Sequence, residues 1–394
     1  MTDRKPLSGI KVFDATQGVA GPHATMLLAQ HGANVIKVEP LDGDWGRGLG
    51  KVYGDLCAHA VTFNRGKRSI ALDLKTDEGR AVAHKLASDA DIVVESFRPG
   101  VMARFGLGYE QIKAMREDVI YLSVTGFGQQ GPNRDLPVTD SVIQAFSGLM
   151  SINRDGEGNP QRIGMIAIDV MTGLYAYQAI SSALISRMRF GGGAYIDCSL
   201  MQSAAAFQSA KVMEYFMEDG APQVLYVPVG TMKTADNYIN ITAMRDRHYV
   251  SLCQVIGRED LIEDPRFNTR DKRVAREAEL MPLIRAEFLK RTTAEWCELL
   301  TAAEVMNSAI ATYDDYLKDE HVNAVNGVAW VEHQGVGRVP MVNIPGLPAI
   351  DGADAMTECA HIGQHTRAIL GEAGYGADQI AALLASNAIA ESSV

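Results

Sequence analysis

The sequence predicts an α/β protein built on a parallel sheet, and three neighbouring features near its amino end carry that prediction. Residues 10–16 alternate apolar and polar side chains and run into a loop of small residues at 17–22. A helix is expected over 23–31, ended by Gly32, and an apolar strand follows over 35–39. Strand, glycine loop, helix and strand in this order form a βαβ unit, whose strands lie parallel and whose crossover is right-handed.

Further segments of the same kind continue the pattern. Strands are expected over 69–74, 91–95 and 119–125, and a helix over 77–88. The uncharged stretch 170–186 contains Thr, Gly, Tyr, Gln and Ser, so it predicts a buried helix of a soluble protein rather than a membrane span. The chain is therefore predicted to be α/β through about residue 200.

A second, smaller domain is predicted in the later part of the chain. Proline and glycine between 219 and 230 indicate a boundary. An alternating strand at 238–243 and charged helical segments after it are typical of an α+β unit. We therefore predict a large Rossmann-like domain made from residues 1–200 with 330–394, linkers at 201–224 and 326–340, and a small domain at 225–325.

The composition limits the kinds of binding partner and the cellular compartment that are expected. The net charge of −11 argues against a nucleic acid or an anionic membrane as a partner. The five cysteines are scattered without a CxxC pair, and the first residues lack a signal-peptide apolar core, so a cytoplasmic location is expected. The sequence contains no HExxH, CxxC or GxSxG motif. We therefore expect no resident metal and no permanently bound cofactor.

Asp169 is the most informative single residue. It is the only charged residue between Arg162 and Arg187, in a segment otherwise predicted to be buried. An unpaired buried charge is costly, so this carboxylate needs partners or a chemical role. It could cap a helix beginning near Val170. Alternatively, it could act as a covalent nucleophile.

The loop after the first strand and several basic residues indicate a nucleotide-like ligand. Gly18 and Gly21 do not match the GxGxxG spacing of a nicotinamide site, yet the loop still presents N–H groups at a helix start. Lys75 and Arg98 follow predicted strands, at the sheet edge where α/β proteins bind ligands. Together with Lys67, Arg68 and Arg104 they could neutralise several phosphates.

Seven motifs in order make the chain resemble the family III CoA-transferases, the group that includes formyl-CoA:oxalate and carnitine CoA-transferases. The motifs cover nearly the whole chain: PLSGIKVFDATQGVAGPHATMLLAQHGANVIKVEP, FNRGKRSIALDLKTDEGR, DIVVESFRPGVMARFGLGYEQI, SVTGFGQQGP, QAFSGLM, IDVMTGLYAYQAI and, near the end, GQHTRAILGEAGY. The resemblance implies two subunits threaded through each other as interlocked rings, that is, a homodimer.

The resemblance also implies the chemistry. Asp169 would attack an acyl-CoA thioester, for example succinyl-CoA or acetyl-CoA, to form a mixed anhydride, and CoA thiolate would convert this to an aspartyl-CoA thioester. An acceptor acid, such as a small dicarboxylate, would then take the CoA. A carboxylate already ionised at pH 7 needs no general base for this attack. Water has to be excluded, because an anhydride is an activated acyl group.

Positions for coenzyme A and the acyl group follow from the same resemblance. The positions implied to contact CoA are Gln17, Gly18, Ala20, Leu72, Lys75, Phe97, Arg104 and Met201. The acyl group and its oxyanion are expected near Thr139, Asp140, Gly126 and Gly128, and small residues around Gly173 are expected to help. Pro40 and Pro137 stand where formyl-CoA transferase has an arginine and a lysine.

Two other functions are alternatives to CoA transfer. The 2-methylacyl-CoA racemases are similar to this chain but place a histidine where it has Thr139. Threonine cannot act as a base near neutral pH, so CoA transfer is favoured over epimerisation. The third possibility is a protein that binds CoA or another nucleotide without covalent chemistry, and it would never form an acyl-enzyme.

Overall fold

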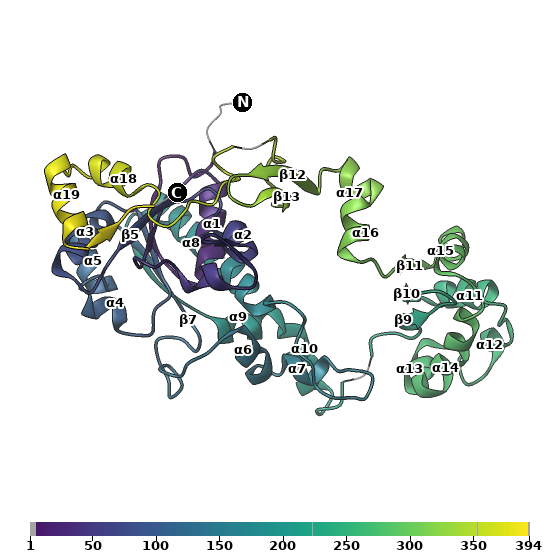
Figure 1. The fold of residues 1–394 in the computed structure, drawn as a ribbon. Coiled ribbons are helices and arrows are strands. Elements are labelled where there is room, and N and C mark those ends of the chain that lie inside the picture. Colours follow the sequence, from purple (N-terminus) through teal and green to yellow (C-terminus); the bar gives the residue numbers. More distant parts are fainter. Residues whose placement is uncertain (1–4, 223, 353, 393–394) are drawn as a thin grey trace. The chain divides into compact units, whose positions relative to one another are not determined.

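The computed structural model describes residues 5–222, 224–352 and 354–392 (Figure 1). The chain divides into two compact units, one made from residues 1–209 with 326–394 and the other from residues 210–325. Both ends of the chain therefore belong to the same, larger unit.

The larger unit is built on a seven-stranded sheet with the order β14-β5-β2-β1-β6-β7-β8. Its strands are β1 (Lys11–Ala15), β2 (Asn34–Glu39), β5 (Arg68–Leu72), β6 (Ile92–Glu95), β7 (Ile120–Thr125), β8 (Ala194–Ser199) and β14 (Ile389–Ala390). Neighbours from β5 to β8 pair in parallel, and β14 runs antiparallel to β5 at one edge. This mixed sheet, rich in parallel strands, confirms the predicted α/β class.

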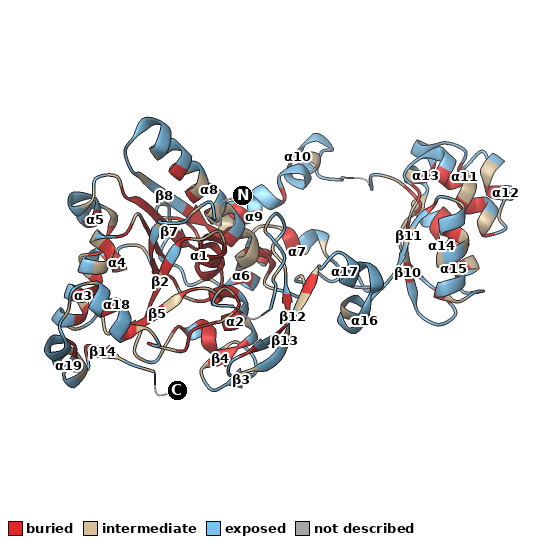
Figure 2. Ribbon diagram, turned by 90° about the horizontal axis from the view of Figure 1, so that it is seen from above, coloured by how far each residue is buried: buried red, intermediate tan, exposed pale blue. Residues whose placement is uncertain are grey.

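Helices cover both faces of this sheet. Buried residues of α1 (Ala20–Gln30), α8 (Ala167–Phe190) and α9 (Leu200–Phe207) form one apolar core with the sheet. Those of α3 (Asp77–Ser88), α5 (Tyr109–Met115), α18 (Thr366–Glu372) and α19 (Ala377–Ala385) form a second core. Figure 2 shows buried residues concentrated in the strands and in α1. Strands buried on both faces are expected of a parallel sheet.

Helix α1 begins earlier than its sequence indicates. It starts at Ala20, although we expected residue 23, because the fixed φ of Pro22 suits the first turn of a helix. It ends at Gln30, with His31 as its C-cap residue, and Gly32 then adopts a positive φ of 101°. The loop between β1 and α1 is therefore only four residues long, 16–19.

Shorter elements complete the larger unit. They are η1 (Trp45–Gly48), β3 (Val52–Tyr53), β4 (Leu56–Cys57), α2 (Ala58–Asn64), α4 (Val101–Arg104), α6 (Asp140–Phe146), α7 (Leu149–Ile152), β12 (Val328–His333) and β13 (Gly337–Val342). The range 326–340, which we expected to be a linker, contains β12 and part of β13, which pair as a hairpin. Val331 and Met341 are buried with Leu56 and Cys359, and this apolar contact makes the hairpin part of the unit.

The second unit has its own core and an antiparallel sheet of order β11-β10-β9. Its elements are α10 (Ser209–Met217), β9 (Val229–Lys233), β10 (Tyr238–Thr242), α11 (Asp246–Val255), α12 (Asp260–Glu263), α13 (Arg270–Ala275), α14 (Glu277–Phe288), α15 (Thr293–Ala302), β11 (Met306–Ala309), α16 (Tyr313–Lys318) and α17 (Glu320–Ala324). The range 201–224, also expected to be a linker, holds most of α9 and all of α10.

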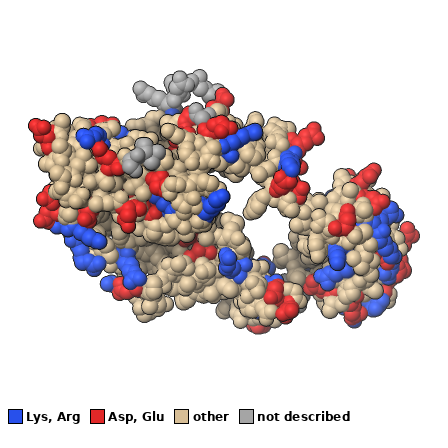
Figure 3. All heavy atoms as spheres, in the orientation of Figure 1, with Lys and Arg blue, Asp and Glu red and all other residues tan. Residues whose placement is uncertain are grey.

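The surface mixes charges of both signs. On the face drawn in Figure 3, Lys and Arg side chains are interspersed with Asp and Glu, so the described residues there form no continuous basic surface. In the described ranges, no helix is both long and apolar enough to cross a membrane.

Buried ion pairs fix the loop between β1 and α1. The ammonium group of Lys67 lies 3.0 Å from the Asp14 carboxylate, and both side chains are at most 1% exposed. Burial by itself raises the pKa of Asp14, but the charges of Lys67 and Lys37 outweigh it, so this pKa is lowered. Asp14 also accepts hydrogen bonds from the backbone N–H and the hydroxyl of Thr16. The pair therefore anchors the start of the loop.

We expect Lys67→Met to lower the free energy of unfolding of the larger unit by about 3–5 kcal/mol, because Asp14 would keep a buried charge without its cation. The matched control is Lys11→Met, which removes an exposed pair with Asp89 and should cost at most about 1 kcal/mol. Thermal melting followed by circular dichroism compares the two variants. Equal melting temperatures would contradict this account of the buried pair.

Candidate active site

A cavity of about 340 Å³ opens at the carboxyl ends of the central strands. The loop after β1 contributes Gln17, the loop after β6 contributes Phe97, and the segment after β7 contributes Gly126 and Thr139. Asp169 lines the same cavity, which we call the Asp169 cavity. Its charged lining residues are Asp169, Arg98 and Arg134. The cavity therefore places one carboxylate with two cations.

Asp169 lies in the first turn of α8 and does not cap that helix. The N-cap residue is Ile166, so the capping interpretation of Asp169 is wrong. No hydrogen bond joins its partly buried carboxylate to another described residue. Burial, and then the charge of Asp140, raise the pKa of Asp169 to about 7. Our expectation of a fully ionised carboxylate at pH 7 therefore needs correction, because burial and the charge of Asp140 both oppose its ionisation.

Asp140 supplies the cap that the sequence suggested for Asp169. Its Oδ2 accepts the backbone N–H groups of Ile168 (2.7 Å) and Asp169 (3.1 Å). Its Oδ1 accepts a bond of 2.6 Å from the amide of Gln144. Asp140 is 4% exposed and does not line the cavity itself. Its contact with Asp169 is through the backbone N–H groups at the start of α8.

A second cavity of about 460 Å³ adjoins the first. Gln17 and Phe97 line both cavities. The second one also contains Leu72, Lys75 and Pro40, and we call it the Lys75 cavity. The two cavities thus meet at the loops that follow β1 and β6, and together they offer a long cleft with a carboxylate in one part and an ammonium group in the other.

Gly18 packs closely against Trp45 and offers no free N–H group. Its φ of 80° is in the left-handed region that favours glycine. A Cβ atom added there would come within 2.3 Å of the Trp45 ring, which lines the Asp169 cavity. Its N–H donates to Asp44 at 2.8 Å. Gly18 is therefore required for the close packing of Trp45.

Four other predicted residues do not line either cavity. Arg104 is exposed at the end of α4, and Met201 on α9 packs against the apolar core. The N–H of Gly128 donates to the hydroxyl of Thr125, so it is not free for an oxyanion. Asp140 is the fourth, as described above. Ala20, in contrast, does line the Asp169 cavity.

Gly173 has a packing role. A Cβ atom at this position would lie 2.6 Å from the ring of His23 on α1. The His23 ring also contacts the carbonyl of Val170 at 3.1 Å. Gly173 therefore allows α1 and α8 to approach closely, and it is not among the residues that line the Asp169 cavity. The expectation that it helps to bind an oxyanion is not supported by this geometry.

The basic residues expected to meet phosphates are separated by the fold. Lys67 is buried against Asp14, and Arg68 begins β5, at the opposite end of the strands, where it pairs with Glu372. Lys75 and Arg98 do line the cleft. Lys67 precedes β5 and Lys75 follows it, so these two lysines flank the same strand at opposite ends.

The lining residues that sequence reasoning missed include Trp45 and Arg134. Arg134 is the only cation between Arg116 and Arg154, and this isolation was the available signal. Trp45 lies in η1, a short helix capped by Asp44. No periodic pattern points to a side chain on such a short element.

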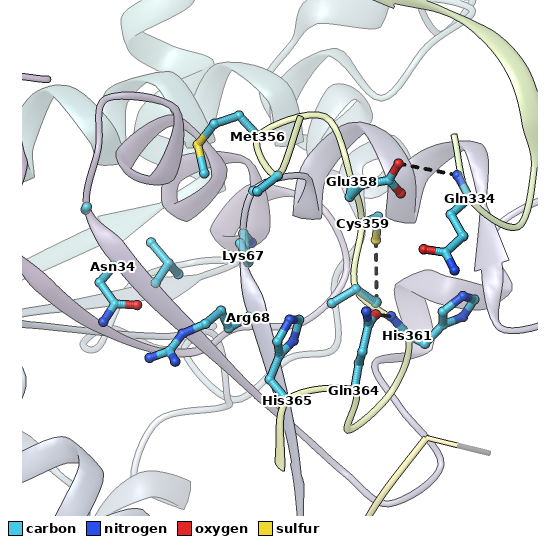
Figure 4. A pocket seen from close by; sticks show the side chains of 15 residues that line it. Asn34, Lys67, Arg68, Gln334, Met356, Glu358, Cys359, His361, Gln364 and His365 are labelled. Carbon is cyan, nitrogen blue, oxygen red and sulfur yellow. Dashed lines mark hydrogen bonds between the residues drawn. The ribbon is translucent and has the colours of Figure 1, made fainter. Parts of the chain in front are cut away.

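A third cavity, of about 450 Å³, lies where β2 and β5 begin (Figure 4). Asn34, Arg68, Gln364 and His365 are among its lining residues. Lys67 and Arg68, two of the basic residues expected to meet phosphates, line it, but none of the residues expected to contact CoA, the acyl group or the oxyanion does. The GQHT part of the closing motif serves the fold here, since the Ser69 hydroxyl accepts the N–H of Gly363, and the Ser69 N–H donates to the His365 ring.

Among the described residues, no group of three or more His, Cys, Asp or Glu side chains is placed to hold a metal ion.

Known proteins are similar to this chain in both fold and sequence. The profile of CoA-transferase family III matches residues 7–366. Succinyl-CoA:glutarate CoA-transferase from Mus musculus is 34% identical over 98% of this chain and 90% of its own length. Succinate–glutarate CoA-transferase from Agrobacterium fabrum is 34% identical over 94% of this chain and 97% of its own. The crystal structure of a CAIB/BAIF family protein from Brucella suis, 32% identical, has a TM-score of 0.83 and covers 94% of this chain and 100% of its own. The chain therefore belongs to CoA-transferase family III and is an enzyme that transfers CoA.

Proposed function

We propose that this enzyme moves CoA from an acyl-CoA, such as succinyl-CoA or acetyl-CoA, to a small dicarboxylate, with Asp169 as the covalent nucleophile. The observation that carries the proposal is the position of Asp169. Its carboxylate lines a cavity, receives no hydrogen bond from a described residue, and has a raised pKa. A carboxylate used only for structure would be expected to have hydrogen-bond partners.

The proposed route needs no reactant other than the acyl-CoA, Asp169 and the acceptor acid. Ionised Asp169 attacks the thioester carbon, the C–S bond breaks, and CoA thiolate leaves a mixed anhydride. The thiolate attacks the aspartyl carbonyl and expels the donor acid, which gives an aspartyl-CoA thioester. The acceptor carboxylate then attacks the aspartyl-CoA thioester, displaces CoA thiolate and forms a second mixed anhydride. The thiolate attacks the acceptor's carbonyl carbon in that anhydride, which gives the acceptor's CoA thioester and frees the Asp169 carboxylate. Each step exchanges one activated acyl bond for another.

Two observations support a dicarboxylate as substrate. Arg98 and Arg134 line the cavity with Asp169, and a guanidinium group binds a carboxylate through paired N–H donors. A dicarboxylate joined to Asp169 through one end keeps a second carboxylate that needs such a partner. Both relatives described above carry glutarate in their names. Gly126 and Thr139 would contact the acyl group from the segment after β7.

The Lys75 cavity suits the nucleotide part of CoA. Lys75 offers an ammonium group to a phosphate, Leu72 and Phe97 offer apolar surface, and Gln17 lies between the two cavities. The further proposed contacts of CoA are Gly18, Ala20, Arg104 and Met201. For Arg104, the contact would use an exposed side chain at the rim.

We propose further that the enzyme is cytoplasmic and works as an interlocked homodimer. Exposed apolar side chains support self-association: Met188 is 84% exposed, Phe190 75% and Phe216 80%. Met188 and Phe190 lie two residues apart near the end of α8, and exposed apolar patches are typical of interaction surfaces.

Asp169→Asn should abolish CoA transfer from succinyl-CoA to glutarate, by about three orders of magnitude or more, because an amide cannot form the anhydride. Wild-type enzyme incubated with succinyl-CoA and hydroxylamine should give a hydroxamate at Asp169, detected by peptide mass spectrometry.

A transferring enzyme that gives no product at Asp169 would disprove the covalent route. Deuterium entering the position next to the thioester of a 2-methylacyl-CoA, with no acceptor acid, would instead indicate a racemase. CoA binding without any covalent product or turnover would indicate a binding protein.

The rate should depend on pH near neutrality. Only ionised Asp169 attacks, and its pKa is raised to about 7, so kcat/KM should fall about tenfold per pH unit well below pH 7 and level off above it. The measurement is kcat/KM from pH 5.5 to 9, with circular dichroism at each pH as the control for folding. A rate that stays level down to pH 5.5 would show that Asp169 is ionised throughout this range in the free enzyme.

A further inference from the structure

Asp140 and Gln144 form a buried polar pair directly behind the nucleophile. Both lie on α6, four residues apart, and are 4% and 0% exposed. As described above, one oxygen of Asp140 accepts the N–H groups of Ile168 and Asp169, and the other accepts the Gln144 amide. The carboxylate thus receives three N–H groups from neutral donors.

The orientation of Gln144 is fixed by its own partners. Its Oε1 accepts the N–H of Ile163 at 2.8 Å, and its Nε2 donates to the carbonyl of Met165 at 3.2 Å as well as to Asp140. These bonds require the oxygen to face Ile163 and the nitrogen to face Asp140. The pair therefore ties α6 to the segment that leads into α8 and to the first turn of that helix.

The charge of Asp140 is not neutralised by a cation. No Lys or Arg among the described residues forms an ion pair with it, although buried carboxylates usually have one. Its charge acts on Asp169, where it adds to burial in opposing ionisation. When Asp169 is acylated, its negative charge disappears, and the repulsion between the two carboxylates disappears with it.

We propose that Asp140, oriented by Gln144, is a positioning residue for Asp169. It holds the first turn of α8 in place, and its charge disfavours free ionised Asp169 relative to the acylated form. This inference rests on the proposed function, since it assigns Asp140 a role in acylation. An ordinary helix cap would account for the hydrogen bonds alone, whereas the proposal requires both the hydrogen bonds and the charge.

Two variants separate the hydrogen bonds from the charge. Asp140→Asn removes the charge. It also replaces one accepting oxygen by an NH₂ group, which then faces another donor: either the Gln144 amide or the N–H groups of the helix. When Asp140→Asn is combined with Gln144→Glu, the introduced amide can donate to the introduced carboxylate, whose other oxygen can still accept from Ile163. The double variant restores most of the bonds and moves the charge one helical turn along α6. Asp319→Asn, at the cap of α17, is the matched control.

The first measurement is turnover at pH 8.5, where wild-type Asp169 is ionised. We expect Asp140→Asn to lower kcat about tenfold to a hundredfold, because small displacements of a nucleophile cost rates of this order. The double variant should recover most of that loss, and Asp319→Asn should match the wild type. A wild-type rate in folded Asp140→Asn, or no recovery in a double variant that melts like the wild type, would overturn the positioning role.

The second measurement follows Asp169 without substrate. Carbodiimides modify protonated carboxyl groups, so the labelling rate at Asp169 against pH, read by peptide mass spectrometry, reports its titration. The midpoint should move to lower pH in both Asp140 variants and stay in place in Asp319→Asn. An unchanged midpoint would overturn the role of the charge. Because this assay needs no turnover, a shifted midpoint with no hydroxamate at wild-type Asp169 would reject the proposed function and leave the effect of the charge standing.

Discussion

The buried charges beneath the loop between β1 and α1 are the interaction on which the site depends. Lys67 pairs with Asp14, and Lys37 donates both to Asp44 at 2.9 Å and to the carbonyl of Thr16. Asp44 in turn accepts the N–H of Gly18. The loop is therefore bound at its start and its middle by ions that have no access to water. Moving it would separate buried charges, which is far more costly than bending a surface loop.

Asp169 is held in a balance of opposing effects. As part of the first turn of α8, it lies where the helix dipole favours a negative charge. Burial and the charge of Asp140 oppose ionisation more strongly, and the pKa rises to about 7. A carboxylate with a higher pKa is a stronger nucleophile when ionised, and at this value a large fraction is still ionised at neutral pH. In the proposed route, the same arrangement that makes the ionised form costly would make it a stronger nucleophile.

The sequence predicted what depends on local pattern and missed what depends on contacts between distant segments. Periodicity predicted the βαβ order, and the absence of neighbouring charges singled out Asp169. The cap of α8 comes from Asp140, 28 residues before Ile168, and no local rule joins these positions. Lys67 gives no sign of burial in the sequence, because its partner Asp14 lies 53 residues away. Sequence reasoning therefore grouped the basic residues near strand ends together, although in the fold some are buried in ion pairs and others line the cavities.

The order of the strands explains why two cavities meet at Gln17 and Phe97. β1 and β6 are neighbours, and the helices that follow them pack on opposite faces of the sheet, α1 in one core and α5 in the other. The loops after these strands therefore diverge and leave a crevice at the point where the winding reverses. The N–H of Gln17 donates to the hydroxyl of Ser96 at 2.8 Å and bridges the two loops across it. A thioester of CoA has a charged nucleotide at one end and a reactive acyl group at the other. A crevice with Lys75 in one part and Asp169 in the other matches that order of charges, so the topology of the sheet sets the direction in which such a substrate would lie.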